Sequence, residues 1–330
     1  MKQMLSLFLL ISLFSCGSKD TLVPEVPVYE PPTDSIATAG YHSGLIVYGE
    51  RSSQYQVSDR VGIIDMATGT ERLLYPENDT VVNCLARFPR FDRTSDRIIF
   101  TARPETGTTN HDIFSIKADG TGLTNLTNSP NSNEQIACPA PDGKLVAFIN
   151  ASNYKVWQLN LLYPDNTRKT LAQWNNGKLN NITDNYLMWS RDGAHIFYTA
   201  TKDSLLTGVY RYDVATGEST LLTDKSFNCI ITALSPVDYR IMVLQVRPDV
   251  YKTALISMDF NGKNIVTETT FDSGSPGEGA WSPDGQHIVF CVDRKRPANQ
   301  QMQYYFLADP QHVGERIGAE RGSKMAFDWK

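Results

Sequence analysis

One strand-and-turn pattern recurs six times along the chain at intervals of about fifty residues, and this repetition restricts the fold more than any other feature. In the clearest copies, at residues 141–148, 188–198 and 280–290, a turn carrying Asp-Gly precedes a short apolar strand. Weaker copies lie at residues 91–100 and 235–243. The residues at one equivalent strand position, 45 to 52 residues apart, are Tyr48, Phe100, Phe148, Tyr198, Val243 and Phe290. Short strands with Gly-bearing turns at this period predict a β-propeller.

A second turn follows in most units. An alternating apolar strand ends in Asp, usually with Gly a few residues later, as at Asp65 with Gly69 and Asp213 with Gly217. The Asp side chain accepts hydrogen bonds from nearby backbone amides and Gly adopts positive φ, so the pair closes a tight hairpin. We therefore interpret these aspartates as structural rather than metal-binding or catalytic. Each unit then has four strands, and the predicted fold is an all-β, six-bladed β-propeller over residues 41–330.

The two ends of the chain are expected to share one blade. Residues 324–330 resemble the innermost strand that opens the other units, whereas the first unit begins directly at its second strand, residues 45–48. Pairing these two segments would close the ring and leave no exposed sheet edge. We therefore predict that the C-terminal strand completes the N-terminal blade.

Residues 1–15 have the pattern of a signal peptide. Lys2 precedes an apolar run at residues 4–14, which is too short to cross a bilayer. Residues 13–16, Leu-Phe-Ser-Cys, resemble the lipobox of bacterial lipoproteins. The resemblance implies cleavage before Cys16 and attachment of a diacylglyceryl group to its thiol, which would anchor the protein in a membrane.

The residues after Cys16 bear on the location of the protein. Gly17 is not the Asp that retains proteobacterial lipoproteins at the inner membrane, so the resemblance favours the outer membrane, facing either the periplasm or the cell surface. Residues 18–20, Ser-Lys-Asp, resemble the surface-export signals of Bacteroidetes lipoproteins. Residues 16–40 are rich in Pro, which predicts a semi-rigid tether between the lipidated Cys16 and the propeller.

Composition and spacing exclude several kinds of partner. The formal net charge is −5, with no block of Lys and Arg, so no nucleic acid is expected as a partner. His195 and His287 occupy equivalent positions of two repeats, which indicates a shared structural role. No motif for a catalytic nucleophile or a metal occurs, so we predict no catalytic set, no metal and no cofactor.

The cysteines after Cys16 lack the CxxC spacing of a zinc site, so we expect buried thiols that act as small hydrophobes. They are Cys84, Cys138, Cys229 and Cys291. A disulfide between Cys229 and Cys291 is the alternative, because both fall toward the same end of neighbouring blades.

A charged set on the innermost strands is the one candidate binding site. Glu278 lies three positions before Trp281, and the equivalent positions of other blades include Lys324, Arg87 and Tyr186. Innermost strands line the central channel of a propeller. We therefore predict a charged arc of Glu278, Lys324 and Arg87 at the channel mouth, with Tyr186 opposite. The alternative is a solvated rim of ion pairs without a binding role.

The unit Trp-Ser-Pro-Asp-Gly-x-x-Ile-x-Phe, followed by an Ile-Phe-x-Ile-x-x-Asp-Gly strand and a Leu-Thr ending, resembles the WD40-like repeats of the TolB propeller family. The match covers residues 41–330 and is weakest in the fifth unit, where residues 235–238 lack Asp-Gly. TolB carries a separate N-terminal domain, whereas this chain has a tether in that place. The resemblance implies a ring in the cell envelope that binds proteins through its faces or its channel.

Two functions remain open at this point. The first is a lipid-anchored, non-catalytic scaffold that binds an envelope protein or another ligand. The alternative is an enzyme at the channel mouth, a lyase or hydrolase acting on carbohydrate, for which a glycan would be the partner. A hydrophobic or aromatic patch on one face of the ring would favour the scaffold. Convergence of His, Asp or Glu on the channel would favour the enzyme.

Overall fold

The computed structural model describes residues 43–52, 59–76, 85–104, 109–152, 156–175, 186–202, 206–246, 253–271, 276–293, 300–306, 315–317 and 322–330. Within these ranges the regular secondary structure consists of β-strands, and no helix is present that could span a bilayer. The predicted signal peptide and tether lie outside the described residues.

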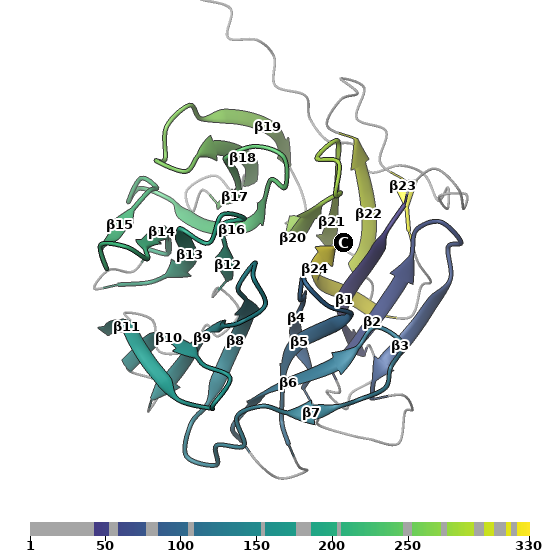
Figure 1. Cartoon of the computed structure of the whole chain (residues 1–330). Coiled ribbons are helices and arrows are strands. Elements are labelled where there is room, and N and C mark those ends of the chain that lie inside the picture. The colour runs from purple at the N-terminus through teal and green to yellow at the C-terminus, as the bar shows by residue number, and fades with distance from the viewer. Residues whose placement is uncertain are drawn as a thin grey trace, which may run out of the picture.

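The strands pair into six antiparallel sheets of four strands, arranged around a common centre (Figure 1). Sheet 1 is β24 (Gly322–Trp329), β1 (Leu45–Ser52), β2 (Asp59–Asp65) and β3 (Glu71–Tyr75). Sheet 2 is β4 (Arg87–Phe91), β5 (Arg97–Ala102), β6 (Asp112–Lys117) and β7 (Thr124–Asn125). Sheet 3 is β8 (Glu134–Pro139), β9 (Val146–Ser152), β10 (Val156–Leu162) and β11 (Arg168–Asn175).

The other three sheets follow the same order from the innermost to the outermost strand. Sheet 4 is β12 (Leu187–Trp189), β13 (His195–Ala200), β14 (Gly208–Asp213) and β15 (Ser219–Leu221). Sheet 5 is β16 (Asn228–Leu234), β17 (Arg240–Val246), β18 (Thr253–Asp259) and β19 (Val266–Phe271). Sheet 6 is β20 (Pro276–Trp281), β21 (His287–Asp293), β22 (Gln300–Phe306) and β23 (Glu315–Arg316). The prediction of an all-β propeller with four-stranded blades is confirmed.

The predicted pairing of the two chain ends is also confirmed. β24 runs antiparallel to β1, with Trp329 opposite Ile46. Beyond this ladder the Leu45 N–H donates to the Lys330 carbonyl (2.6 Å), and the Lys330 N–H donates to the Leu45 carbonyl (2.9 Å). The backbone groups along β1 that would form an open sheet edge are therefore paired.

β24 connects sheet 1 to both neighbouring sheets. Asp328 accepts a hydrogen bond from the Phe91 N–H of sheet 2 (2.7 Å) and forms an ion pair with Arg93. On the other side, the buried Trp329 shares a hydrophobic cluster with Ala280 of sheet 6. The last residues of the chain thus hold three sheets together.

The hydrophobic core is divided among the spaces between neighbouring sheets. The described side chains at the repeat position identified from the sequence are all fully buried: Tyr48, Phe100, Phe148, Tyr198 and Val243. Phe100 clusters with Val47 of sheet 1, and Phe148 clusters with Ile99 of sheet 2. The repeated residue therefore packs against the preceding sheet, so each blade depends on its neighbour for burial.

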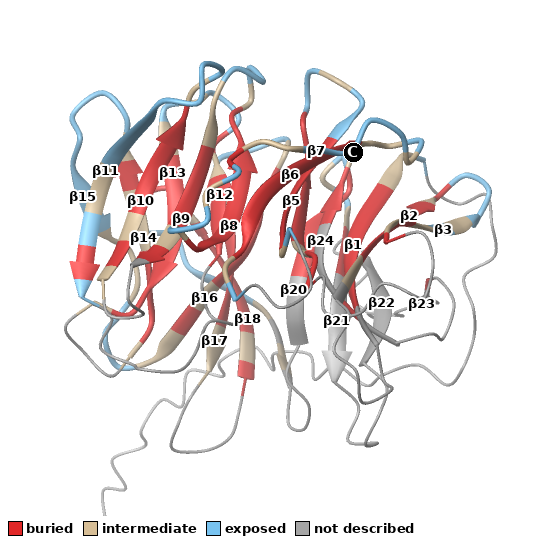
Figure 2. Ribbon diagram, turned by 90° about the horizontal axis from the view of Figure 1, so that it is seen from below, coloured by how far each residue is buried: buried red, intermediate tan, exposed pale blue. Residues whose placement is uncertain are grey.

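Antiparallel order places two sets of turns at the same end of the sheets, which we call the turn face. These turns lie at residues 65–69, 92–96, 117–121, 141–144, 163–167, 190–194, 213–217, 235–239, 259–263 and 282–286. Figure 2 shows exposed turns gathered at this end, where the C-terminus also lies. We call the opposite end of the sheets the loop face.

The turn aspartates have the predicted structural role. The Asp213 carboxylate accepts hydrogen bonds from the backbone N–H groups of Ala215 (3.1 Å) and Thr216 (2.9 Å). Gly217 follows with a φ of 75°, a conformation that side chains with a Cβ rarely adopt. The sequence pattern and the geometry of the turn therefore agree.

The two equivalent histidines share one backbone arrangement, as predicted. The His195 N–H donates to the Ser190 hydroxyl (2.8 Å), and the His287 N–H donates to the Ser282 hydroxyl (2.9 Å). Both bonds close the turn that precedes the second strand of the sheet.

Cys138 and Cys229 are buried free thiols, and burial raises the pKa of each to about 11. The prediction of buried thiols is confirmed for these two. The alternative disulfide between Cys229 and Cys291 is wrong, because Cys229 is free. Cys84 lies outside the described residues.

The turn aspartates predict a specific response to acid. The hydrogen bond from the Ser190 hydroxyl lowers the pKa of Asp192, and the bond from the Thr216 backbone lowers the pKa of Asp213. An unfolded Asp has a pKa of about 3.9, so this stabilisation is complete above that pH and is lost as the pH falls through the lower folded pKa. We predict that the variant Asp192→Asn with Asp213→Asn loses less thermal stability between about pH 5 and about pH 3 than the unmodified protein.

Melting temperatures of the two proteins are compared by calorimetry or circular dichroism below about pH 5. This range is chosen because protonation of His287 causes a separate loss of stability that begins at a higher pH. Burial lowers the pKa of His287, so that loss begins near the unfolded value of about 6.5 and is common to both proteins. Melting temperatures that fall in parallel for the two proteins would contradict the prediction.

Candidate functional site

The four residues predicted for the channel mouth lie on or beside innermost strands of four different sheets. Arg87 opens β4, Tyr186 directly precedes β12, Glu278 lies within β20, and Lys324 lies within β24. These strands occupy the middle of the molecule in Figure 1. The side chain of Glu278 lies outside the described residues, as does the predicted lipidation site Cys16.

The Lys324 ammonium is held within sheet 1. Its Nζ lies 3.2 Å from Oε1 of Glu71 and 5.2 Å from the centre of the Tyr48 ring. The Tyr48 hydroxyl donates to the same Glu71 oxygen. Lys324 is only 2% exposed, and it links the innermost strand to Glu71 on the outermost strand β3. Because the Lys324 side chain is buried, it is not part of a solvent-exposed rim of ion pairs.

Gly62 makes room for this cluster. A Cβ atom at Gly62 would lie 2.3 Å from the Tyr48 ring, closer than real Cβ contacts allow. Gly62 is opposite Tyr48 in the β1–β2 ladder. The absent side chain therefore lets the Tyr48 ring lie across β2 toward Glu71.

Tyr186 is buried and packs edge-to-face against Phe88, with 6.0 Å between the ring centroids. Phe88 lies in β4 of sheet 2, and Tyr186 directly precedes β12 of sheet 4. Sheet 3 lies between these two sheets in the order of the ring, so the two side chains contact each other across the centre. Phe88 has a positive φ of 53°. Aromatic side chains therefore fill part of the centre at this level. Arg87 is half-buried, and its role with Glu278 in a charged arc stays a prediction.

A second candidate site is an apolar patch on the turn face of sheets 4 and 5, which we call the docking patch. Its residues are Val214, Val237, Tyr239, Ile265 and Val266. Tyr239 is 65% exposed and Val237 is 59% exposed. An exposed group of large apolar side chains is typical of a surface that binds another molecule.

Contacts between turns connect two residues of the docking patch, Tyr239 and Val214, to residues 194–195 of sheet 4. The Tyr239 ring packs edge-to-face on Phe260, 5.3 Å between centroids, and Phe260 in turn lies 6.3 Å from the His195 ring. The Val214 N–H donates to the Ala194 carbonyl, next to His195 (3.0 Å). The patch therefore spans the junction of two sheets.

The local fold of the fifth unit explains why Val237 and Tyr239 are exposed. In this turn the Ser235 hydroxyl accepts the backbone hydrogen bonds that the Asp carboxylate accepts in other units. The donors are the N–H groups of Val237 (3.4 Å) and Asp238 (3.3 Å), and both bonds are weak. The Ser235 N–H donates to the Arg240 carbonyl (3.0 Å), which closes the turn. The turn keeps its shape while its tip changes from polar to apolar.

The sequence contained a signal for this site. The fifth unit was recognisable as the one that departs from Asp-Gly, and the departure itself places Val237 and Tyr239 at a turn tip. In the described part of the chain, no cluster of three or more His, Cys, Asp or Glu could hold a metal ion.

Comparison with solved structures identifies the fold. The crystal structure of TolB from Acinetobacter baumannii matches with a TM-score of 0.69 and 18% sequence identity, covering 87% of this chain and 66% of that one. A putative TolB from Agrobacterium tumefaciens matches with a TM-score of 0.55 and 14% identity, covering 87% and 98% of the two chains. A chain of a nidogen/laminin complex matches at 0.62 and 8% identity, covering 87% and 98%.

These likenesses show a TolB-like β-propeller fold. The chain spans about two thirds of the length of the Acinetobacter protein, 66%. No family model matches the chain, and no curated protein matches it.

The buried Lys324–Glu71 pair predicts a measurable coupling. We expect Lys324→Met to lower the free energy of unfolding by about 3 to 5 kcal/mol, because the nearly buried Glu71 carboxylate would lose the ammonium that lies 3.2 Å from it. The double variant Lys324→Met with Glu71→Gln should recover most of that loss, because neither charge remains. Chemical denaturation of the unmodified protein, both single variants and the double variant measures the coupling. Unchanged stability of Lys324→Met would contradict this prediction.

Proposed function

We propose that the protein is a lipid-anchored scaffold of the cell envelope, whose propeller binds another envelope protein through the docking patch. The observation that carries this proposal is the exposure of Val237 and Tyr239 at a turn tip where the equivalent residues of the other repeats are polar or small. Because these two side chains are exposed, they are not needed to fill the hydrophobic core. Exposed aromatic and aliphatic side chains are instead typical anchors of protein interfaces.

A six-bladed ring supports this proposal, because it would present the patch on a rigid body. The described strands form six sheets, and the innermost strands contact one another in a closed cycle of β24, β4, β8, β12, β16 and β20. The docking patch bridges two blades of this ring. A partner would therefore meet a surface whose shape is set before binding, which lowers the entropic cost of association.

The anchor rests on the sequence. The lipobox-like residues before Cys16 and the Pro-rich segment up to residue 40 would hold the ring close to a membrane, and Gly17 favours the outer membrane. The likeness to TolB propellers supports an envelope location. The lipid would restrict the protein to the membrane surface and so raise its effective concentration near a membrane-bound partner.

Photo-crosslinking in intact cells tests this function. Tyr239 is replaced by p-benzoylphenylalanine, and we expect irradiation to give one discrete adduct with an envelope protein. The matched control carries the same residue at Leu123, which is 46% exposed on a turn of sheet 2, outside the docking patch. Val237→Ser should weaken the adduct at position 239 several-fold, because it removes apolar contact area from the same patch. Identical adducts from positions 239 and 123, or none from position 239, would contradict the proposal.

A further inference from the structure

The chain that precedes the ring enters it at the turn face. The Trp329 indole N–H donates to the Ser43 carbonyl (3.0 Å), and the Met66 N–H donates to the Gly44 carbonyl (3.0 Å). Met66 belongs to the turn at residues 65–69, which is part of that face. The segment before Ser43 therefore starts from the same end of the sheets that carries the docking patch.

The Pro-rich tether has an apolar stripe that a spacer does not require. Its Pro content at residues 24–32 favours polyproline II, which repeats every three residues. At this period one side of the segment is entirely apolar, and its residues are Val23, Val26, Tyr29 and Pro32. Glu25 and Glu30 fall on the other two sides. Polyproline II segments with apolar residues on one side are typical ligands of surfaces that present aromatic side chains.

The tether is long enough to bring this stripe to the docking patch. Six sheets whose faces pack about 10 Å apart give a ring about 20 Å across at the innermost strands, and each second strand lies about 5 Å farther out. The turn-face ends of β1 and β17 are therefore at most about 30 Å apart. The chain from Tyr29 to Ser43 reaches about 43 Å as polyproline II, at about 3.1 Å per residue.

Two guanidinium groups lie beside the docking patch. Arg191 donates to the Pro236 carbonyl (2.6 Å), next to Val237, and Arg211 donates to the carbonyl of Phe260 (2.9 Å), the residue on which Tyr239 packs. Within the described ranges neither guanidinium forms an ion pair with a carboxylate.

The acidic residues of the tether could pair with these guanidiniums. Glu25 and Glu30 flank Val26 and Tyr29 in the sequence. Asp238 is also exposed on this turn and would oppose them, so the pairing would orient the segment more than it would add affinity. The apolar contact is therefore the main attraction.

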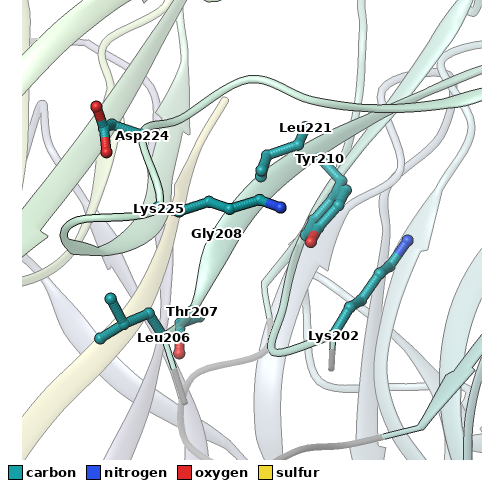
Figure 3. A pocket seen from close by; sticks show the side chains of 8 residues that line it. All are labelled: Lys202, Leu206, Thr207, Gly208, Tyr210, Leu221, Asp224 and Lys225. Carbon is teal, nitrogen blue, oxygen red and sulfur yellow. The ribbon is translucent and has the colours of Figure 1, made fainter. Parts of the chain in front are cut away.

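The pocket drawn in Figure 3 is not an equivalent site for the tether. It lies at the loop-face end of sheet 4 and has a volume of about 320 Å³. The Tyr210 ring stands between the ammonium groups of Lys202 and Lys225. The Lys202 Nζ also donates to the Tyr198 hydroxyl (2.6 Å) and lies 4.1 Å from the centre of the Tyr210 ring. This cation is thus engaged within the fold, and the pocket is at the end of the sheets away from the tether.

We propose that residues 22–32 bind the docking patch of the same chain, with Val26 and Tyr29 packed against Val237 and Tyr239. A tethered ligand has an effective concentration in the millimolar range, so weak contacts are enough to keep the patch covered. An envelope partner would have to displace the segment. This consequence rests on the function proposed above, whereas the docking of the segment does not.

Photo-crosslinking of the purified full chain at low concentration tests the docking. Tyr239 is replaced by p-benzoylphenylalanine, and we expect irradiation to join the tryptic peptide 226–240 to the tryptic peptide 20–51. Fragment masses should place the bond within residues 22–32. The matched control carries the same residue at Leu123, exposed on a turn of sheet 2, and should give no bond to residues 22–32.

Variants in the tether separate specific docking from chance contact. Val26→Ser with Tyr29→Ser should lower the yield of the bond several-fold, because it removes the apolar stripe. Ile36→Ser is the matched control, an apolar residue of the same tether outside residues 22–32, and should leave the yield unchanged. In intact cells, Val26→Ser with Tyr29→Ser should raise the yield of the adduct between position 239 and the envelope partner several-fold, because the patch is no longer covered.

Three results with the purified chain would overturn the docking. They are no bond to residues 22–32, an unchanged yield in the variant Val26→Ser with Tyr29→Ser, and a yield that rises with protein concentration. The last result would identify contact between two copies of the chain. An unchanged adduct in cells carrying the same variant would overturn competition with the partner. Absence of the cellular adduct from a chain that forms the internal bond would contradict the proposed function alone.

Discussion

Backbone pairing between β24 and β1 joins the last residues of the chain to the first strand that the structure describes. Every interface between sheets depends on this join, because each sheet buries its faces against its neighbours rather than in a core of its own. Trp329 packs toward sheet 6, and Asp328 binds the backbone of sheet 2. Without the join, the edge of β1 and the apolar faces beside it would be open to water and to other chains.

Because the ring is closed, the residues free to vary lie mainly in the turns and loops at the two ends of the sheets. Tight turns gather at the turn face, where Asp and Gly keep most of the tips polar. The fifth unit keeps its turn through Ser235 but presents Val237 and Tyr239 to solvent. The docking patch therefore occurs where one unit differs from the others, which is where function can be added without disturbing the shared framework.

The period of the repeat predicted the propeller, the four strands per unit, the closure and the turn aspartates, because each follows from local patterns. The environment of Lys324 could not be predicted in this way. Strand alignment placed its backbone on an innermost strand, but the long side chain turns along the sheet to Glu71, a residue far away in the sequence. Tyr186 was expected at the channel mouth opposite the charged arc, and its packing on Phe88 of a sheet that is not its neighbour was not predicted. Side-chain direction and contacts across the centre depend on packing that no local pattern contains.

The most direct test of this account removes residues 325–330 and measures thermal unfolding together with hydrogen exchange of the β1 amides. Closure by β24 predicts a melting temperature lower by about 10 °C or more, rapid exchange along β1 and aggregation through the opened edge. A truncated protein that keeps the melting temperature, the solubility and the protected β1 amides of the full chain would contradict it.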